Sequence, residues 1–189
     1  MTTTSVTYVC GSGDLYGNDA AFLNTAGQIG FGGGGGGETA YKAWVPFTVN
    51  LRNRLKIFSA TLKVRASSNK AGTTVKVKIG CEAADNPSAP ANWSQLNART
   101  LTTAYTTDDN VASWTEGTEY SFDITTAVQE ILNRAGWASG QTMAVLTADN
   151  GSTTGAVREF ASSENASYDE AKLVIAYYKG GQLIIWSSE

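Results

Sequence analysis

Residues 120–137, YSFDITTAVQEILNRAGW, contain the one helix that the sequence predicts in an otherwise β-rich chain. The carboxylate of Asp123 can accept the free N–H groups of a first helical turn, so we expect the helix to begin there. Asn133, Arg134 and Gly136 predict its end, because glycine tolerates the left-handed conformation that closes a helix. Apolar residues recur between these signals at helical spacing, namely Ile124, Val128, Ile131 and Leu132. We therefore predict a short α-helix over residues 124–134, whose apolar stripe packs against the rest of the protein.

The remainder of the chain is a series of short strand-like runs separated by turn signals, such as those at residues 69–72 and 149–151. This pattern is typical of a sandwich or barrel of many short strands. In the clearest run, residues 73–81, apolar residues alternate with lysine. We expect a long loop over residues 83–93 and strands over residues 5–10, 41–49, 57–66, 73–81, 99–104, 143–146, 156–161 and 171–178. The predicted fold is all-β, a jelly-roll-like antiparallel β-sandwich with one short α-helix.

The length of 189 residues fits one domain with a tail. We expect residues 1–40 to be an N-terminal strand and glycine-rich loop region, packed on or extending from a sandwich of residues 41–178. Six consecutive glycines, Gly32–Gly37, lack the fixed spacing and the following helix of a phosphate-binding loop, so they predict a flexible loop. The alternative is that glycine lets this backbone lie flat against a neighbouring subunit.

Residues 179–189 form an apolar tail that departs from the strand pattern. The tail begins with a Gly-Gly joint that follows the strand expected to close the sandwich. Its apolar residues are Leu183, Ile184, Ile185 and Trp186. The tail can fold back as a last strand, or it can pair with another copy or another protein. In the second case these four residues form a protein interface.

The sequence contains no histidine. This excludes the usual general base, the Ser–His and Cys–His nucleophile pairs and histidine-based zinc sites. Four acids lie close together in the sequence, namely Glu116, Glu119, Asp123 and Glu130. Positions at the rim of a loop and at a helix cap account for them, so no catalytic role is needed to explain them. We therefore expect a protein that is not an enzyme, with no catalytic residues and no cofactor. We predict no metal site either, although a calcium ion in the loop from Asp14 through Asn18 to Asp19 is the alternative to plain solvation of that loop.

No apolar stretch approaches the roughly 18 residues of a membrane span, and residues 1–5 lack the basic and apolar regions of a signal peptide. We therefore expect synthesis in the cytoplasm. Two cysteines, Cys10 and Cys81, are too few for a disulfide framework. We predict free, buried strand thiols, with a bridge as the alternative in oxidising surroundings.

Charge is unevenly distributed along the chain. Residues 1–100 carry ten basic and five acidic side chains, a net charge of +5, whereas residues 101–189 carry four and twelve, a net charge of −8. If the cations of two strands share the outer face of one sheet, the domain presents a basic patch made of Lys63, Arg65, Lys76 and Lys78. Simple solvation of the strand faces accounts for these cations most directly. As a binding surface, the patch would suit an acidic protein neighbour, an acidic polysaccharide or, least compatible with so acidic a protein, nucleic acid.

Four motifs follow one another in the chain: a strand ending in Pro46 and Phe47, SATLKV at 59–64, the segment from Trp114 to DITTAV at 123–128, and LVIAY at 173–177. In this order they resemble the DNRLRE-type β-sandwich domains of secreted carbohydrate-binding proteins and of surface or virion proteins. The resemblance covers residues 40–178. It implies the same sandwich, and a function in binding or building rather than in catalysis.

A domain of this type without a leader suits a phage virion component, which is made in the host cytoplasm and acts outside the cell after lysis. We therefore expect a capsid cement or decoration protein, or a tail or fibre component, located in the virion. Its expected partners are other copies of the chain, a major capsid or other virion protein and an acidic glycan, but neither nucleic acid nor a membrane.

The alternative function is that of a carbohydrate-binding module for an acidic polysaccharide. Trp93 and Trp114 lie in or beside predicted loops, where indole faces can stack on sugar rings. Trp44 and Trp137 are predicted to pack in the core instead.

Overall fold

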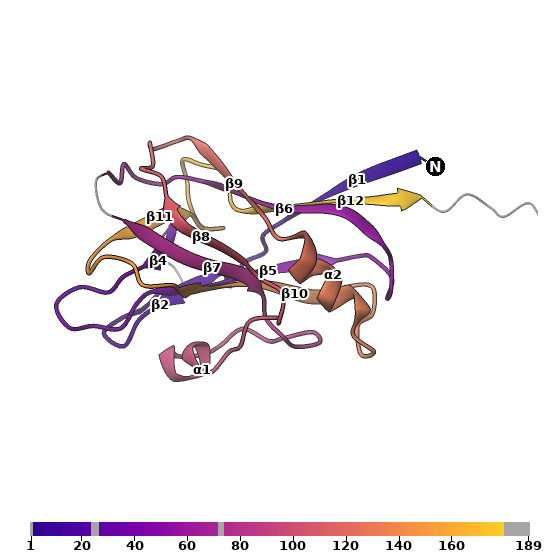
Figure 1. The fold of residues 1–189 in the computed structure, drawn as a ribbon, viewed down its shortest axis with the longest axis horizontal. Helices are drawn as coiled ribbons and strands as arrows, with labels where there is room; N and C mark the ends of the chain where they lie inside the picture. Colours follow the sequence, from indigo (N-terminus) through magenta and orange to yellow (C-terminus); the bar gives the residue numbers. More distant parts are fainter. Residues whose placement is uncertain (1, 24–26, 72–73, 180–189) are drawn as a thin grey trace, which may run out of the picture.

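The computed structural model describes residues 2–23, 27–71 and 74–179, which fold as a β-sandwich (Figure 1). One sheet has four strands, in the order Thr2–Val9 (β1), Lys172–Lys179 (β12), Ile57–Arg65 (β6) and Glu119–Asp123 (β9). The other has six strands, in the order Phe22–Leu23 (β3), Leu15–Gly17 (β2), Lys42–Val49 (β5), Gln141–Asp149 (β10), Val75–Cys81 (β7) and Thr106–Val111 (β8). Every strand pairing among the described residues is antiparallel. The predicted all-β sandwich is confirmed, while its jelly-roll connectivity stays a prediction.

The predicted helix is confirmed as Thr125–Asn133 (α2). The N-cap position is taken by Ile124, whose side chain makes no capping hydrogen bond, so the helix begins two residues after Asp123. Asp123 still helps to order the start, because the backbone N–H and the hydroxyl of Thr125 donate to its Oδ1 over 2.9 and 2.6 Å. The apolar stripe of the helix is buried and packs against β6 and β7. Figure 1 shows α2 between the two large sheets at one end of the sandwich. At the opposite end, Gln28–Gly32 (β4) pairs with Val157–Ala161 (β11) in a small separate sheet.

The predicted reason for the end of α2 is wrong. The helix ends because Arg134 adopts an extended conformation, with φ −66° and ψ 139°, and Gly136 is absent from the glycines with positive φ. A side chain at position 136 would contact the carboxylate of Asp85, which would have to move. That carboxylate accepts a hydrogen bond from Nε of Arg134 over 2.7 Å.

A second helix, Trp93–Asn97 (α1), covers the outer face of the six-stranded sheet and replaces the end of the predicted loop. The side chain of Asn92 accepts the N–H of Gln95 over 3.0 Å, and the side chain of Gln95 accepts the N–H of Ala91 over 2.8 Å. This reciprocal cap stabilises a very short helix. Below it lies a small core, separate from the main core between the sheets, formed by Leu15, Trp44, Leu96, Ala144 and Leu146.

The predicted strand over residues 99–104 is wrong. Only Leu101 pairs there, in an isolated bridge with Glu82, and the strand lies at Thr106–Val111 (β8) instead. The sequence TTDDNV lacks apolar alternation because β8 lies at the edge of its sheet and buries only Val111 in the core. Residues 2–40 also do more than pack on the sandwich, since they supply strands to all three sheets.

Several predictions about buried side chains are confirmed. Trp44 and Trp137 are buried, and the Nε1 of Trp137 donates to the carbonyl of Leu51 over 2.9 Å. Cys10 and Cys81 are free and buried, and burial raises the pKa of both thiols above the ordinary value. Within the described ranges, no helix is both long and apolar enough to cross a membrane.

Candidate functional site

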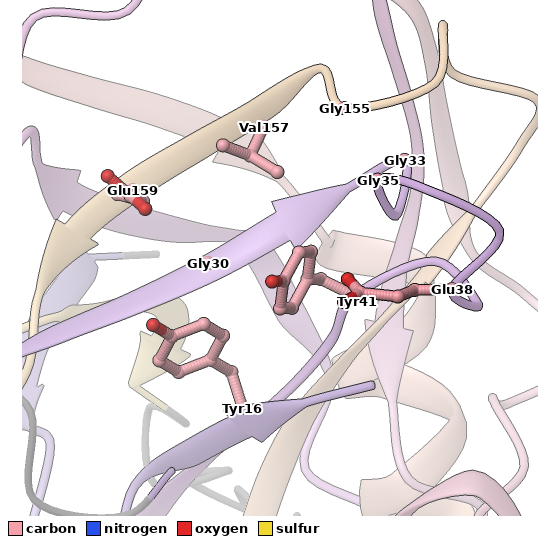
Figure 2. Close-up of a pocket in the computed structure, with 9 residues that line it drawn as sticks. All are labelled: Tyr16, Gly30, Gly33, Gly35, Glu38, Tyr41, Gly155, Val157 and Glu159. Atoms are coloured by element: carbon pink, nitrogen blue, oxygen red, sulfur yellow. The ribbon is translucent and has the colours of Figure 1, made fainter. Parts of the chain in front are cut away.

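A cleft of about 230 Å³ lies where β2, β4, β11 and the glycine-rich segment meet (Figure 2). We call it the tyrosine cleft, and it is lined by Tyr16, Gly30, Gly33, Gly35, Glu38, Tyr41, Gly155, Val157 and Glu159. Figure 2 shows Val157 and Glu159 on β11 to one side of β4, and the rings of Tyr16 and Tyr41 to the other side. The lining residues come from distant parts of the chain, which the pairing of β4 with β11 brings together.

The two tyrosines form the aromatic wall of the cleft. Their ring centroids are 5.7 Å apart and the ring planes are tilted by 41°. The ring of Tyr16 lies flat on the backbone at Gly30, where an added Cβ would approach a ring carbon to 3.2 Å. Burial raises the pKa of the Tyr16 hydroxyl, a hydrogen bond with the Gln28 side chain opposes this rise, and the nearby Glu159 carboxylate adds to it. Tyr16 is therefore a neutral phenol at physiological pH.

The glycine run forms the rim of the cleft, and the prediction of a flexible loop is wrong for its first half. Gly33 donates its N–H to the carbonyl of Ala156 over 2.8 Å, and Gly155 donates to the carbonyl of Gly34 over 2.9 Å. A Cβ at Gly33 would lie 2.5 Å from the carbonyl oxygen of Thr153. Glycine therefore lets two backbones of the same chain pack together, so the close approach expected against a neighbouring subunit occurs within the molecule.

Two carboxylates complete the tyrosine cleft. Glu159 accepts hydrogen bonds from Nζ of Lys70 over 2.8 Å and from Oγ of Ser68 over 2.9 Å. Glu38 is exposed and accepts one hydrogen bond, from Nδ2 of Asn18 over 2.9 Å.

Tyr16 is buried, with 6% of its surface exposed, so the half-buried Tyr41 is the ring that a ligand in the cleft can reach. An aromatic face beside carboxylates suits a ligand with hydroxyl groups on an apolar ring, because the ring can stack while the hydroxyls donate. The cleft can therefore bind a sugar without any chemical step.

The two tryptophans predicted to bind glycan do not share a site, since Trp93 lines a separate small pocket with Tyr41 and Lys42. Trp114 is buried, with 2% of its surface exposed, and its ring stacks on Tyr120 with centroids 4.6 Å apart. A ligand therefore cannot reach its face, and the prediction for Trp114 is wrong. Trp93 is half-buried at the start of α1, where it packs against the small core.

The four cations predicted to share one sheet face lie on two different sheets. Lys63 and Arg65 are on β6 of the four-stranded sheet, whereas Lys76 and Lys78 are on β7 of the six-stranded sheet. The prediction of a single basic patch is therefore wrong. Lys63 also binds the Glu119 carboxylate over 2.8 Å.

The acidic residues that the sequence brings together have separate partners in the structure. Glu116 accepts from the hydroxyl of Tyr168 over 2.9 Å, and Glu130 accepts the N–H groups of residues 103 and 104 over 2.9 and 2.8 Å. In the loop considered for calcium, Asp14 is buried and accepts from Ser163, while Asp19 is exposed and accepts from Thr39. Each of these acids therefore has a structural role that the fold explains.

A second candidate site is the outer edge of β1, with which no other strand of residues 2–23, 27–71 and 74–179 pairs. We call it the free edge of β1. Thr2 pairs with Lys179 and Val9 with Lys172, and the ladder continues in the N–H of Cys10, which donates to Ala171 over 2.9 Å. In an antiparallel pair, hydrogen-bonded residues alternate with residues whose backbone groups point the other way. The even-numbered residues of β1 therefore bond to β12, and the free edge presents the N–H and C=O groups of Thr3, Ser5, Thr7 and Val9.

The other three edges of the two large sheets carry protective features. β3 has two residues, and β8 carries Asp108 and Asp109 and pairs with β7 through a register shift. β9 carries Glu119 and Asp123. Short length, charge and irregular pairing all oppose the addition of a further strand. β1 has none of these features, since it spans eight residues, carries no charge and pairs without a shift.

No family model matches the chain, and no curated protein is similar to it. The resemblance to the DNRLRE-type domains therefore stays a prediction. The predicted interface residues Leu183, Ile184, Ile185 and Trp186 lie outside the described residues.

Proposed function

We propose that the chain is a non-enzymatic structural protein of a phage virion, such as a capsid cement or decoration protein or a tail or fibre component, which acts through protein–protein contacts. The observation that carries this proposal is the free edge of β1. A long, uncharged edge strand is a template for strand addition, and folded proteins that do not use such an edge protect it. The contrast with the protected edges of β3, β8 and β9 supports a functional reason for leaving β1 open.

The outer face of the four-stranded sheet also favours assembly. The side chains of β1 and β12 along the middle of this edge are small and uncharged, so a partner can approach closely, and they are Thr3, Ser5, Thr7, Val174 and Ala176. Lys172 lies on the same face at one end of the ladder, beside Val9. Next to this surface, Phe58 and Tyr178 form an edge-to-face pair with centroids 6.0 Å apart, and 62% and 38% of their surfaces are exposed. Exposed aromatic residues beside a flat polar surface are typical of protein interfaces.

The test is binding to purified capsids of the phage that encodes the chain, measured by co-sedimentation at moderate salt. The full chain, a chain ending at Lys179 and a Ser5→Lys variant are compared. We expect the full chain to co-sediment and the Ser5→Lys variant to bind less, since a lysine on the edge opposes strand addition. The chain ending at Lys179 measures the separate contribution of the tail. Failure of the full chain to bind capsids or other particles of that phage would contradict the proposal.

A second function, glycan binding, is favoured by the tyrosine cleft, which has a volume of about 230 Å³ and an aromatic wall formed by Tyr16 and Tyr41. The test is titration with oligouronates and neutral oligosaccharides, followed by the NMR signals of the tyrosine rings. Binding that is lost in Tyr41→Ala and kept in Trp93→Ala would support this function at the cleft. No change in the tyrosine signals at millimolar ligand would exclude it.

A further inference from the structure

We infer that β1 pairs with β1 of a second copy across a twofold axis at Ser5, so that two four-stranded sheets join into one continuous antiparallel sheet. This inference rests on the proposed function, because it names the partner of the β1 edge. A second copy is the partner that the hydrogen-bonding pattern, the charge and the surroundings of this strand fit.

The hydrogen-bonding pattern restricts the possible registers. The free edge presents the backbone groups of odd-numbered residues, so an added antiparallel strand must place its own free, odd-numbered residues opposite them. The same rule keeps the outer faces of the two sheets on one side, since side chains alternate along a strand. A twofold axis at Ser5 satisfies both conditions, with Ser5 opposite the partner's Ser5 and Thr3 opposite the partner's Thr7.

The surroundings of β1 favour this register over the one with the axis at Val6, and the cross-linking test below distinguishes it from the one with the axis at Thr4. An axis moved by one residue, to Val6, also obeys the pattern, but it shifts the partner's strand past Val9 towards Gly11. The N–H of Gly11 already donates to the carbonyl of Pro46 over 3.4 Å, so the chain's own strand β5 lies along the edge at this point. The axis at Ser5 keeps the partner's strand clear of this contact.

The charge of β1 suits pairing with itself. Around a twofold axis every side chain approaches its own copy or a near neighbour, so a charged strand would bring like charges together. β1 carries threonine, serine, valine and tyrosine, and threonine and serine pairs across strands are favourable. The same pairing of β8 would bring Asp108 and Asp109 close to their copies.

The first test is the mass of the full chain in solution, measured over a range of concentrations without any phage particle. We expect a dimer whose dissociation constant rises about tenfold or more in Ser5→Lys, because two lysines then face each other at the axis. Thr61→Lys is the matched control, since it adds lysine to the same outer face two strands away, opposite Asp123. A monomeric full chain, or equal weakening by both variants, would overturn the inference.

The second test fixes the register by oxidative cross-linking. In the Ser5→Cys variant the two introduced cysteines lie opposite each other, with Cα atoms about 5.5 Å apart, within the range of a disulfide. In the matched Thr7→Cys variant they lie about 14 Å apart, beyond that range. We expect a covalent dimer from Ser5→Cys alone, since the native Cys10 and Cys81 are buried. A covalent dimer from Thr7→Cys, or none from Ser5→Cys, would overturn the register.

The chain ending at Lys179 distinguishes pairing between two β1 strands from pairing of β1 with the tail of a second copy. If pairing occurs between β1 strands, this shortened chain dimerises like the full chain. Loss of the dimer on shortening would overturn the inference, because the partner of the edge would then be the tail. Since no capsid is present in these measurements, a failed dimer and a failed capsid interaction are independent results.

Discussion

The two large sheets of the sandwich differ in how far their outer faces are covered and in how their edge strands are protected. The six-stranded sheet covers its outer face with α1 and ends in a two-residue strand on one side and an acidic strand on the other. The four-stranded sheet leaves its outer face uncovered by any helix in the described part of the chain and ends in the uncharged β1. Both sheets share one core, so stability alone does not require this difference. The uncovered side, which ends in β1, is the side that we propose binds a partner.

Glu82 holds the cover of the six-stranded sheet in place, and its removal should have the largest effect. Its buried carboxylate accepts from Nε1 of Trp44 over 2.7 Å and from Arg99 over 2.6 Å. Glu82→Ala leaves both donors without this acceptor, so we expect a loss of about 3 kcal/mol in the free energy of unfolding. Urea denaturation measures this loss. The control is Glu119→Ala on the uncovered sheet, where loss of an exposed pair should cost about 0.5 kcal/mol. Equal losses would show that Glu82 does not hold the cover.

Proline substitutions in β1 test which backbone groups face the open edge. Proline has no N–H, so Thr4→Pro removes a hydrogen bond to β12, whereas Ser5→Pro removes a donor that faces outward. We expect Thr4→Pro to lower the free energy of unfolding by about 2 kcal/mol more than Ser5→Pro does. Urea denaturation at a concentration where the protein is monomeric measures the difference. If Ser5→Pro were the more damaging change, the assignment of the free backbone groups would be reversed.

Neutral substitutions in β8 should make the edge of the six-stranded sheet less protected and therefore more similar to the β1 edge of the four-stranded sheet. Asp108→Asn and Asp109→Asn together remove the charge of this edge and keep side-chain oxygens for the hydrogen bonds to the N–H of Asn110 and to Nδ2 of Asn150. We expect weak new self-association through β8, worth about 1 kcal/mol or less. Sedimentation of a variant that also carries Ser5→Lys isolates this contact from β1. No new association would mean that the register shift in β8 protects the edge without the charges.

Sequence periodicity predicted the elements that have one buried face. The stripe of α2 and the alternation of residues 75–79 follow directly from packing against the core, and both are confirmed. β8 was missed because it has little apolar surface to bury. α1 was missed as well, although Asn92 followed three residues later by Gln95 is a recognisable helix-start signal.

The candidate sites could not be predicted, because sequence proximity does not determine them. Tyr16 and Glu159 meet only through the pairing of β4 with β11. The open edge of β1 depends on strand order, and no local pattern distinguishes an edge strand of threonine and valine from an inner one. The predicted basic patch failed for the same reason, since alternation places lysines outward without saying on which sheet.

The smallest expected effect concerns the pH dependence of the uncovered sheet. A hydrogen bond from Lys63 lowers the pKa of Glu119 below its ordinary value of 4.5. A carboxylate with a lowered pKa in the folded state adds stability above its unfolded pKa, and this contribution disappears as the pH falls through the folded value. Because the pair is exposed and screened by solvent, we expect it to contribute about 0.5 kcal/mol or less. Urea denaturation between pH 6 and pH 3 should show a slightly smaller loss of stability in Glu119→Gln than in the native chain. An identical pH profile would show that this pair adds nothing to the stability of the folded chain.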